Sequence, residues 1–176
     1  MKFSLISSTF VIALAANPLN AQTNETAVRA KDLHADVHSG VREAANRGLA
    51  AAMSLNAEEM MQMVAQSPDF RYVDGEGHRF DYAGMRKEVS EWFSGLSVQT
   101  MTATSSEVIV LAPDVALYIS QGTLHVTLRS GARLRMAPFS LSLLFKRVKG
   151  AWLVSFWEES HNPPQPDDPS GSAEAN

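Results

Sequence analysis

The pattern of apolar and polar positions is most regular between Ser97 and His161, where runs rich in Val, Thr, Leu, Phe and Tyr follow one another. Three short turn sequences divide this region: Ala112-Pro113-Asp114, Ser130-Gly131-Ala132 and Lys149-Gly150. Glycine and proline between such runs are typical of an antiparallel meander. Each run exceeds the usual strand of about five to six residues, and strands that long twist and curl. The pattern therefore predicts four long strands in a curved, trough-like sheet.

The N-terminal half of the chain shows the three- and four-residue repeat of helices instead. Between Thr23 and Met53 this repeat draws one narrow apolar stripe, which predicts a helix that lies against the sheet. Asn56 begins a second helix, because Glu59 three residues later completes a capping box. Pro68 prevents that helix from continuing.

A small hairpin and a third helix follow. The segment from Asp69 to Phe80 turns at Asp74-Gly75-Glu76-Gly77 and predicts the hairpin. Asp81 caps the third helix and Gly95 ends it. Its apolar stripe is continuous and comprises Tyr82, Met85, Val89, Trp92, Phe93 and Leu96. The order helix, helix, hairpin, helix, meander predicts an α+β domain whose three helices pack into one face of a bent antiparallel sheet.

The first 21 residues have the layout of a secretory signal peptide. Lys2 precedes an apolar stretch, Asn17-Pro18 interrupts it, and Ala21 offers a small residue for cleavage. The stretch is shorter than the roughly 20 residues of a membrane span, although an uncleaved anchor is the alternative. No second apolar run follows, so we expect an exported protein, periplasmic or secreted, that has no membrane partner after cleavage. The predicted organisation is signal peptide 1–21, one domain over 22–161, and a polar, proline-rich disordered tail over 162–176.

Composition excludes some classes of partner. The sequence contains no cysteine, so the core must form without disulfides even in an oxidising compartment. A single domain of this length buries enough surface to do so. The formal net charge of −4 argues against a nucleic-acid partner, which would require a basic face.

Several features occur in the order typical of one superfamily. They are Ser67-Pro68-Asp69-Phe70, Asp74-Gly75, a capped helix, a strand near Ala116, Phe145-Lys146-Arg147 and Gly150-Ala151-Trp152. This arrangement, which covers most of the chain as far as His161, resembles the SnoaL-like branch of the nuclear transport factor 2-like superfamily. The resemblance implies a cone-shaped α+β barrel with a ligand pocket between sheet and helices, often dimerised through the sheet. Members include ketosteroid isomerase, scytalone dehydratase and polyketide cyclases, and their common pattern needs no metal or organic cofactor.

The sequence departs from the family pattern in its last strand. Relatives often carry histidines four and six residues after a tryptophan, followed by a serine. Here Phe156 and Glu158 stand at those two places after Trp152, and Ser160 matches the serine. This difference argues against a histidine-based mechanism, and fold alone does not determine function in such a superfamily.

The last strand also carries the candidate catalytic residues. Glu159 and His161 lie two residues apart, so they share one face with Trp157. A carboxylate that lost water beside the indole would have a raised pKa and could act as a base. The resemblance favours Glu158 instead, because it stands where relatives have a histidine. Glu158, Glu159 and His161 are therefore the candidates, and a solvated rim at the end of the strand is the alternative.

Aromatic side chains are the candidate ligand-binding residues. Tyr72 and Trp92 come from the hairpin and the third helix, which both face the trough, and Trp157 shares the face of Glu159. Each combines a large apolar body with a polar tip, although each could instead be core. His125 lies in a semi-polar row that suits a cavity or an exposed face equally well. Tyr118 has the opposite parity on the same strand.

Other sequence patterns give weaker evidence of a functional role. His34 and His38 have a spacing that could offer two imidazoles to a metal, but two ligands are not a site, so we expect a solvated helix face and no metal. Met60, Met61 and Met63 are flexible side chains that fill a core or line a cavity. The sequence contains no glycine-rich phosphate loop and no Gly-x-Ser-x-Gly elbow.

Three hypotheses for function remain open at this stage. The first is a pocket that binds a small, largely apolar molecule without turnover. The second is a cofactor-free isomerase, dehydratase or cyclase that uses proton transfer, with Glu159 or Glu158 as base and a tyrosine as donor. The third is a non-catalytic dimerisation domain.

A homodimer is expected from the sheet itself. Three helices can cover only one face of four long strands, and apolar residues such as Leu141 and Leu144 occupy both parities of the third strand. Pro138 interrupts that strand and indicates a bulge. A large exposed apolar patch is unusual in a monomer, and a symmetric contact with a second copy would cover it.

Overall fold

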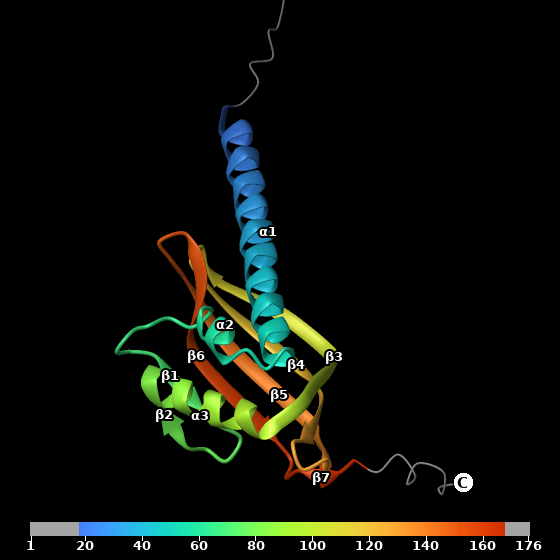
Figure 1. Ribbon diagram of the computed structural model, residues 1–176. Helices are drawn as coiled ribbons and strands as arrows, with labels where there is room; N and C mark the ends of the chain where they lie inside the picture. Colours follow the sequence, from blue (N-terminus) through green and yellow to red (C-terminus); the bar gives the residue numbers. More distant parts are fainter. Residues whose placement is uncertain (1–17, 168–176) are drawn as a thin grey trace, which may run out of the picture. The chain divides into compact units, whose positions relative to one another are not determined.

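The computed structural model describes residues 18–167 (Figure 1). The chain divides into two compact units, Met1–Asp32 and Leu33–Asn176. In the first unit, the described residues form the N-terminal part of helix α1. The predicted signal peptide falls mainly on residues outside the described range, as does the tail beyond residue 167, so export stays a prediction. Within the described range, no helix has the length and hydropathy that crossing a bilayer requires.

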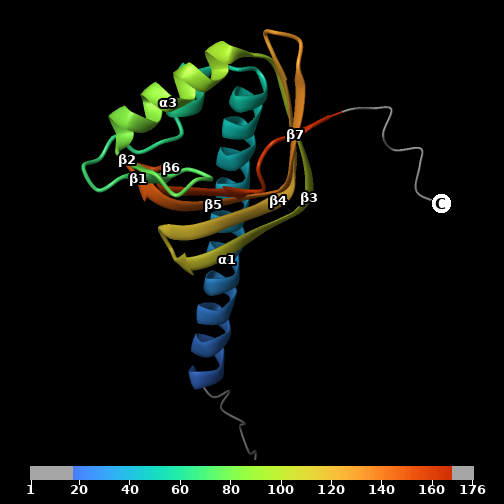
Figure 2. The same cartoon turned by 90° about the horizontal axis from the view of Figure 1, so that it is seen from below.

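The order of elements confirms the α+β class predicted from the sequence. The helices are α1 (Pro18–Met53), α2 (Ala57–Met61) and α3 (Tyr82–Gly95). The strands are β1 (Arg71–Val73), β2 (Arg79–Phe80), β3 (Leu96–Ala112), β4 (Val115–Leu128), β5 (Arg133–Val148), β6 (Ala151–His161) and β7 (Gln165–Pro166). In the second unit, Figures 1 and 2 show α2, α3 and the C-terminal part of α1 on the concave side of the curved sheet.

The strands form one sheet in the order β2-β1-β6-β5-β4-β3, and β7 pairs with β5. The four long strands form the predicted antiparallel meander, but β1 runs parallel to β6, so the sheet is mixed. Tyr72 of β1 stands opposite Trp157 of β6. The hairpin therefore extends the sheet beyond its last long strand and carries Tyr72 to the inner face.

Two predicted boundaries differ from the observed ones. Helix α2 ends at Met61 rather than near Pro68, because the following residues pair with the sheet: the amide of Ala65 donates to the Val154 carbonyl at 2.8 Å. The ordered chain also continues past His161, since β7 pairs with β5 and the amide of Asp167 donates to the Arg133 carbonyl at 2.9 Å.

The core lies between the helices and the inner face of the sheet. Val37 and Val41 of α1 are fully buried, as the four-residue repeat predicts. Alternate residues of β5, including Leu143 and Phe145, belong to the same core and are almost completely buried. Asp81 caps α3 through a 2.8 Å hydrogen bond from the Gly84 amide, and this helix buries Met85, Val89 and Phe93.

Gly122 lies where the sheet bends. The register between β3 and β4 shifts just after the pair Ala103–Gly122, and the register between β4 and β5 shifts between Gly122 and Leu124. A side chain at Gly122 would overlap the carbonyl of Thr102, so the two strands approach each other more closely than another residue would allow. On β5 this irregularity includes Pro138, where the sequence indicated a bulge.

The outer face of the sheet carries a row of apolar residues. Ile109, Leu117, Leu144 and Phe156 stand opposite one another across β3, β4, β5 and β6. All four are partly exposed, and Ile109 keeps 37% of its surface accessible. We call these four residues the outer apolar row.

Candidate functional site

A cavity of about 310 Å³ lies between the inner face of the sheet, helices α1 and α3, and the turn between β1 and β2. Its interior is largely apolar, with leucine, phenylalanine and four methionines: Met53, Met60, Met101 and Met136. Flexible thioethers adapt to irregular ligand shapes. A cavity of this size and character suits a small molecule with a large apolar part.

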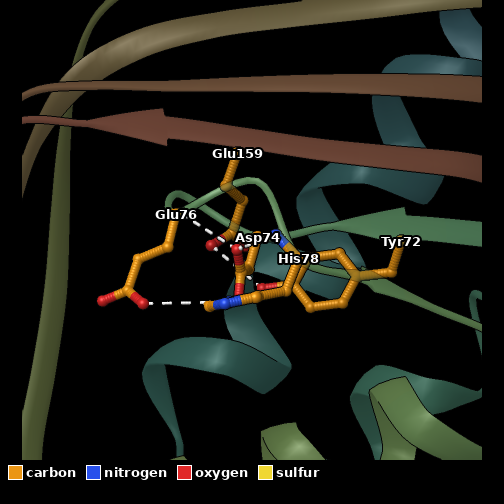
Figure 3. Close-up of polar contacts among 5 residues, drawn as sticks. All are labelled: Tyr72, Asp74, Glu76, His78 and Glu159. Carbon is orange, nitrogen blue, oxygen red and sulfur yellow. Dashed lines mark hydrogen bonds and ion pairs between the residues drawn. The ribbon is translucent and has the colours of Figure 1, made fainter.

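Glu159 brings a carboxylate into this apolar cavity. The indole Nε1 of Trp157 donates to its Oε1 at 2.9 Å, and the phenol of Tyr72 donates to its Oε2 at 3.4 Å. Figure 3 shows Glu159 and Tyr72 near the β1–β2 turn. Each oxygen keeps a further lone pair with which it can accept a proton from a ligand.

Trp157 reaches Glu159 from two residues away on the same strand, and Tyr72 reaches it because β1 pairs with β6. Tyr72 and Trp157 are register partners across these strands, and their rings meet edge to face with centroids 6.4 Å apart. On its other side the Tyr72 ring stacks on Phe80 with centroids 5.6 Å apart. Because both aromatic side chains are buried and held by neighbouring rings, the two hydrogen bonds are preorganised.

Burial raises the pKa of Glu159 above the ordinary value of a glutamate. The hydrogen bonds from Trp157 and Tyr72 and the proximity of His161 act in the opposite direction but do not offset it. Burial, followed by the charge of Glu159, also raises the pKa of Tyr72, so its phenol stays protonated and remains a donor. The site therefore holds a carboxylate that binds a proton more readily than one in water.

His161 lines the same cavity from the end of β6. Its Nδ1 lies 3.0 Å from the carbonyl oxygen of Asn162, and because a carbonyl only accepts, Nδ1 carries the proton. The ring stacks on Phe139 at a centroid distance of 6.0 Å, and its Nε2 lies against Gly75, where a side chain would overlap it. Glycine at this turn position lets the imidazole reach the cavity.

The turn between β1 and β2 is built around Asp74. Its Oδ1 accepts from the backbone amides of Glu76 at 2.9 Å and His78 at 2.8 Å, and its Oδ2 lies 3.0 Å from His78 Nδ1 (Figure 3). Burial acts to raise the pKa of Asp74, but the hydrogen bonds from His78 and Glu76 outweigh it and lower the pKa. The bond to Asp74 raises the pKa of His78.

Five residues predicted from the sequence line the cavity together. They are Tyr72, Trp92, Trp157, Glu159 and His161. Trp92 donates from its indole Nε1 to Gln99 Oε1 at 3.0 Å, and it keeps 40% of its surface exposed. Gln99 in turn donates to the Ala52 carbonyl at 3.2 Å, which ties α1, α3 and β3 together beside the cavity.

Three other predicted residues lie away from the cavity. Glu158 is exposed on the outer face, because it has the opposite parity to Glu159. Tyr118 is 3% exposed and belongs to the core, where it stands opposite Leu143. His125 also has outer-face parity, and its Nδ1 lies 3.0 Å from Asp167 Oδ2. We therefore leave these residues out of the candidate site.

The sequence analysis missed the acidic residues of the cavity. Asp74, Glu76 and Glu88 line it, but the first two were interpreted only as turn residues and Glu88 was not considered. Gln99 was missed as well, although a polar residue at a buried strand position is a usable signal.

The methionines and the histidine pair of the helical region lie in different surroundings. Met60 lines the cavity, while Met61 and Met63 are buried in the core. His34 and His38 stack with centroids 6.4 Å apart on the exposed side of α1. Among residues 18–167, no group of three or more His, Cys, Asp or Glu side chains has the arrangement of a metal site.

A curved sheet that encloses a cavity with N-terminal helices is the architecture of the nuclear transport factor 2-like fold. The sequence model that defines the SnoaL-like domain family matches residues 41–163. The chain therefore belongs to this family. This result confirms the resemblance found in the sequence. A search of curated proteins found no match.

Solved structures share the fold at low sequence identity. A candidate scytalone dehydratase from Novosphingobium aromaticivorans DSM 12444 superposes with a TM-score of 0.69 and 8% identity, over 78% of this chain and 92% of its own. A hexachlorocyclohexane dehydrochlorinase from Novosphingobium barchaimii LL02 superposes with a TM-score of 0.60 and 13% identity, over 82% of this chain and 93% of its own. A nuclear transport factor 2-like protein from Salmonella enterica subsp. enterica serovar Typhimurium str. LT2 superposes with a TM-score of 0.63 and 14% identity. The match covers 84% of this chain and 99% of that protein.

The replacement Glu159→Gln tests the burial of the carboxylate. The folded-state pKa of Glu159 lies above its unfolded value, so ionisation lowers the free energy of unfolding. This destabilisation is absent below the unfolded-state pKa, near about 4.3, and develops as the pH rises through the folded-state pKa. We expect the variant to melt at a higher temperature than the unsubstituted protein at about pH 8, with a difference that shrinks toward about pH 4.

Calorimetric melting curves across this pH range measure the effect. The matched control is Glu158→Gln, which removes the neighbouring exposed carboxylate. An unsubstituted protein that gained stability relative to Glu159→Gln as the pH rose would contradict the assignment.

Proposed function

We propose that this SnoaL-like domain binds a small, largely apolar molecule in its cavity and transfers a proton on it, with Glu159 as the base and without a cofactor. The observation that supports this proposal most directly is the carboxylate of Glu159 in an apolar cavity, with its pKa raised by burial. A base is most effective when its pKa lies near the working pH, and burial moves a glutamate in that direction.

The proposed step is removal of a proton from an activated carbon. The Glu159 carboxylate takes the proton, and the C–H electron pair moves into the ligand. In an isomerisation, Glu159 returns that proton to a different carbon. In an elimination, the electron pair forms a double bond and a leaving group departs with its own bonding pair. The names of the dehydratase and the dehydrochlorinase that share the fold describe eliminations, which supports this reaction class.

His161 and Tyr72 would assist this step in different ways. His161 borders the cavity beside Glu159, and once protonated its Nε2–H can donate to a leaving group or a developing oxyanion. Tyr72 keeps its phenol proton and holds the carboxylate in place through their hydrogen bond. We therefore assign Glu159 as the catalytic base, His161 as the candidate acid and Tyr72 as a positioning residue.

A model substrate, 5-nitrobenzisoxazole, tests the base directly. It is small, flat and apolar, and a carboxylate opens its ring by removing the C3 proton. The C–H electron pair forms the third bond of a nitrile, and the N–O bond breaks with its electron pair on oxygen, so the ring opens to a single coloured phenolate that carries the nitrile. We expect the protein to accelerate this reaction, with a rate that rises as Glu159 ionises and falls at least about 10²-fold in Glu159→Gln.

Two measurements keep this test decisive. The control Glu158→Gln changes the net charge equally at an exposed position away from the cavity and should retain the rate. Fluorescence of the neutral probe N-phenyl-1-naphthylamine reports whether each variant still binds an apolar molecule. Binding of the probe with no acceleration in the unsubstituted protein would support a binding module rather than an enzyme. Failure of both would favour a purely structural role.

We also propose that the domain forms a homodimer through the outer face of its sheet. The outer apolar row is partly exposed on four neighbouring strands. Burying such a row against a second copy would remove apolar surface from water, and a twofold contact requires only one surface to be self-complementary.

Sedimentation of the unsubstituted domain and of Leu144→Glu measures this association. A carboxylate at the centre of the outer apolar row would lose its solvation in the dimer, so we expect a dimer at micromolar concentration and a monomer for the variant. Ser90→Glu, at an exposed position of helix α3 on the concave side of the sheet, is a control outside the proposed interface. A monomeric unsubstituted domain would refute the dimer.

A further inference from the structure

The mouth of the cavity differs from its interior in charge. Asp74 and Glu76 line it from the β1–β2 turn, and Glu88 lines it from α3. Together with Glu159 these make four carboxylates around one cavity. All residues that line the cavity lie in the described part of the chain, and among them His161 is the only cation-forming side chain.

Nearby cations neutralise these carboxylates only in part. His78 lies 3.0 Å from Asp74 Oδ2 and 3.7 Å from Glu76 Oε2, but its side chain is 64% exposed and points into solvent rather than lining the cavity. Lys87 lies 4.0 Å from Glu88 and is 68% exposed, and it makes a closer contact of 3.1 Å with Glu91. The side chains of Asp74, Glu88 and Glu76 are 24%, 44% and 78% exposed, so the negative charge of the mouth lies at the boundary between the cavity and solvent.

An aromatic side chain lies beside the acidic mouth. Trp92 lies one helical turn beyond Glu88 on α3, lines the cavity and is 40% exposed. Its indole N–H is bonded to Gln99, which holds the ring in place beside the cavity that the residue lines. A fixed aromatic face next to carboxylates is an arrangement that attracts organic cations.

We infer that the cavity selects ligands with an apolar body and one positively charged amine. This inference rests on the proposed function and adds the charge of the ligand to it. The apolar body would fill the methionine-rich interior beside Glu159, and the ammonium group would lie at the mouth among Asp74, Glu76 and Glu88. A carboxylate or phosphate ligand would meet like charges instead.

Repulsion between the carboxylates of the cavity contributes to its selectivity for cationic ligands. The charge of Asp74 acts unfavourably on ionised Glu159, so without a bound cation these carboxylates destabilise each other. A cation bound between them would relieve that repulsion, whereas a neutral ligand of the same shape would not. The difference between the two ligands isolates the electrostatic contribution from apolar burial.

Three naphthalene derivatives of nearly equal size provide the test: 1-naphthylmethylamine, 1-naphthalenemethanol and 1-naphthoic acid, which are cationic, neutral and anionic at neutral pH. Their affinities are measured by displacement of N-phenyl-1-naphthylamine. We expect the amine to bind about tenfold more tightly than the alcohol, equivalent to about 1.4 kcal/mol, and the acid to bind most weakly. The advantage of the amine should shrink as salt is added, because the mouth carboxylates are partly exposed.

Variants assign the effect to the mouth. In the double variant Glu76→Gln with Glu88→Gln, the affinity ratio of amine to alcohol should fall by about threefold to tenfold. The control Glu158→Gln lowers the net negative charge on the outer face and should keep the ratio. Equal affinities for the amine and the alcohol, or a ratio that the double variant leaves unchanged, would overturn the inference.

The alcohol separates this inference from the proposed function. If 1-naphthalenemethanol binds and 5-nitrobenzisoxazole is opened, but the amine has no advantage, only the charge preference is wrong. If neither the alcohol nor the amine binds, both the charge preference and the proposed binding function are wrong.

Discussion

The candidate site depends on one constraint: the carboxylate of Glu159 is partly buried in an apolar cavity and must therefore be hydrogen-bonded. A buried charge without partners would be strongly unfavourable. Both donors come from residues that face each other across the pairing of β1 with β6, Tyr72 and Trp157. A strand of three residues thus has a large consequence, because without β1 the carboxylate would lose the Tyr72 hydrogen bond and one wall of its surroundings.

The curvature of the sheet provides the space for this site. At Gly122 the register shifts toward both neighbouring strands, and the close approach to Thr102 allows the long strands to bend around the helices. The bent sheet and the helices leave a cavity with an apolar interior and an acidic mouth. This division lets one carboxylate gain basicity from burial while others keep contact with water, so one cavity combines a base with a charged entrance.

The sequence predicted those parts of the structure that depend on local patterns. The four long strands followed from glycine and proline punctuation, and α3 followed from its stripe and its Asp81 cap. The alternation of a strand put Glu159, His161 and Trp157 on one face. It also separated Glu159 from Glu158, although nothing local showed which of the two faces pointed inward.

The sequence does not show those features of the site that depend on pairing between distant segments. Asp74 looks like an ordinary turn residue until β1 aligns with β6 and brings the turn to the cavity mouth. Tyr118 points inward like its cross-strand partners Val108 and Leu143, but its position along the sheet places it in the core. His125 falls on the outer face, where it meets Asp167 of a segment that the sequence had indicated to be disordered. Parity gives the face of a residue, whereas its position relative to a cavity is set by tertiary packing.

The proposed function requires the carboxylate of Glu159 to be largely removed from water inside the cavity. Carbon-detected NMR titration of the Glu159 carboxyl group, assigned by its absence in Glu159→Gln, measures this property directly. We expect a pKa clearly above the ordinary glutamate value of about 4.3, and a further rise when a neutral apolar molecule such as N-phenyl-1-naphthylamine binds in the cavity. A pKa at or below the ordinary value, unchanged by the bound probe, would contradict it.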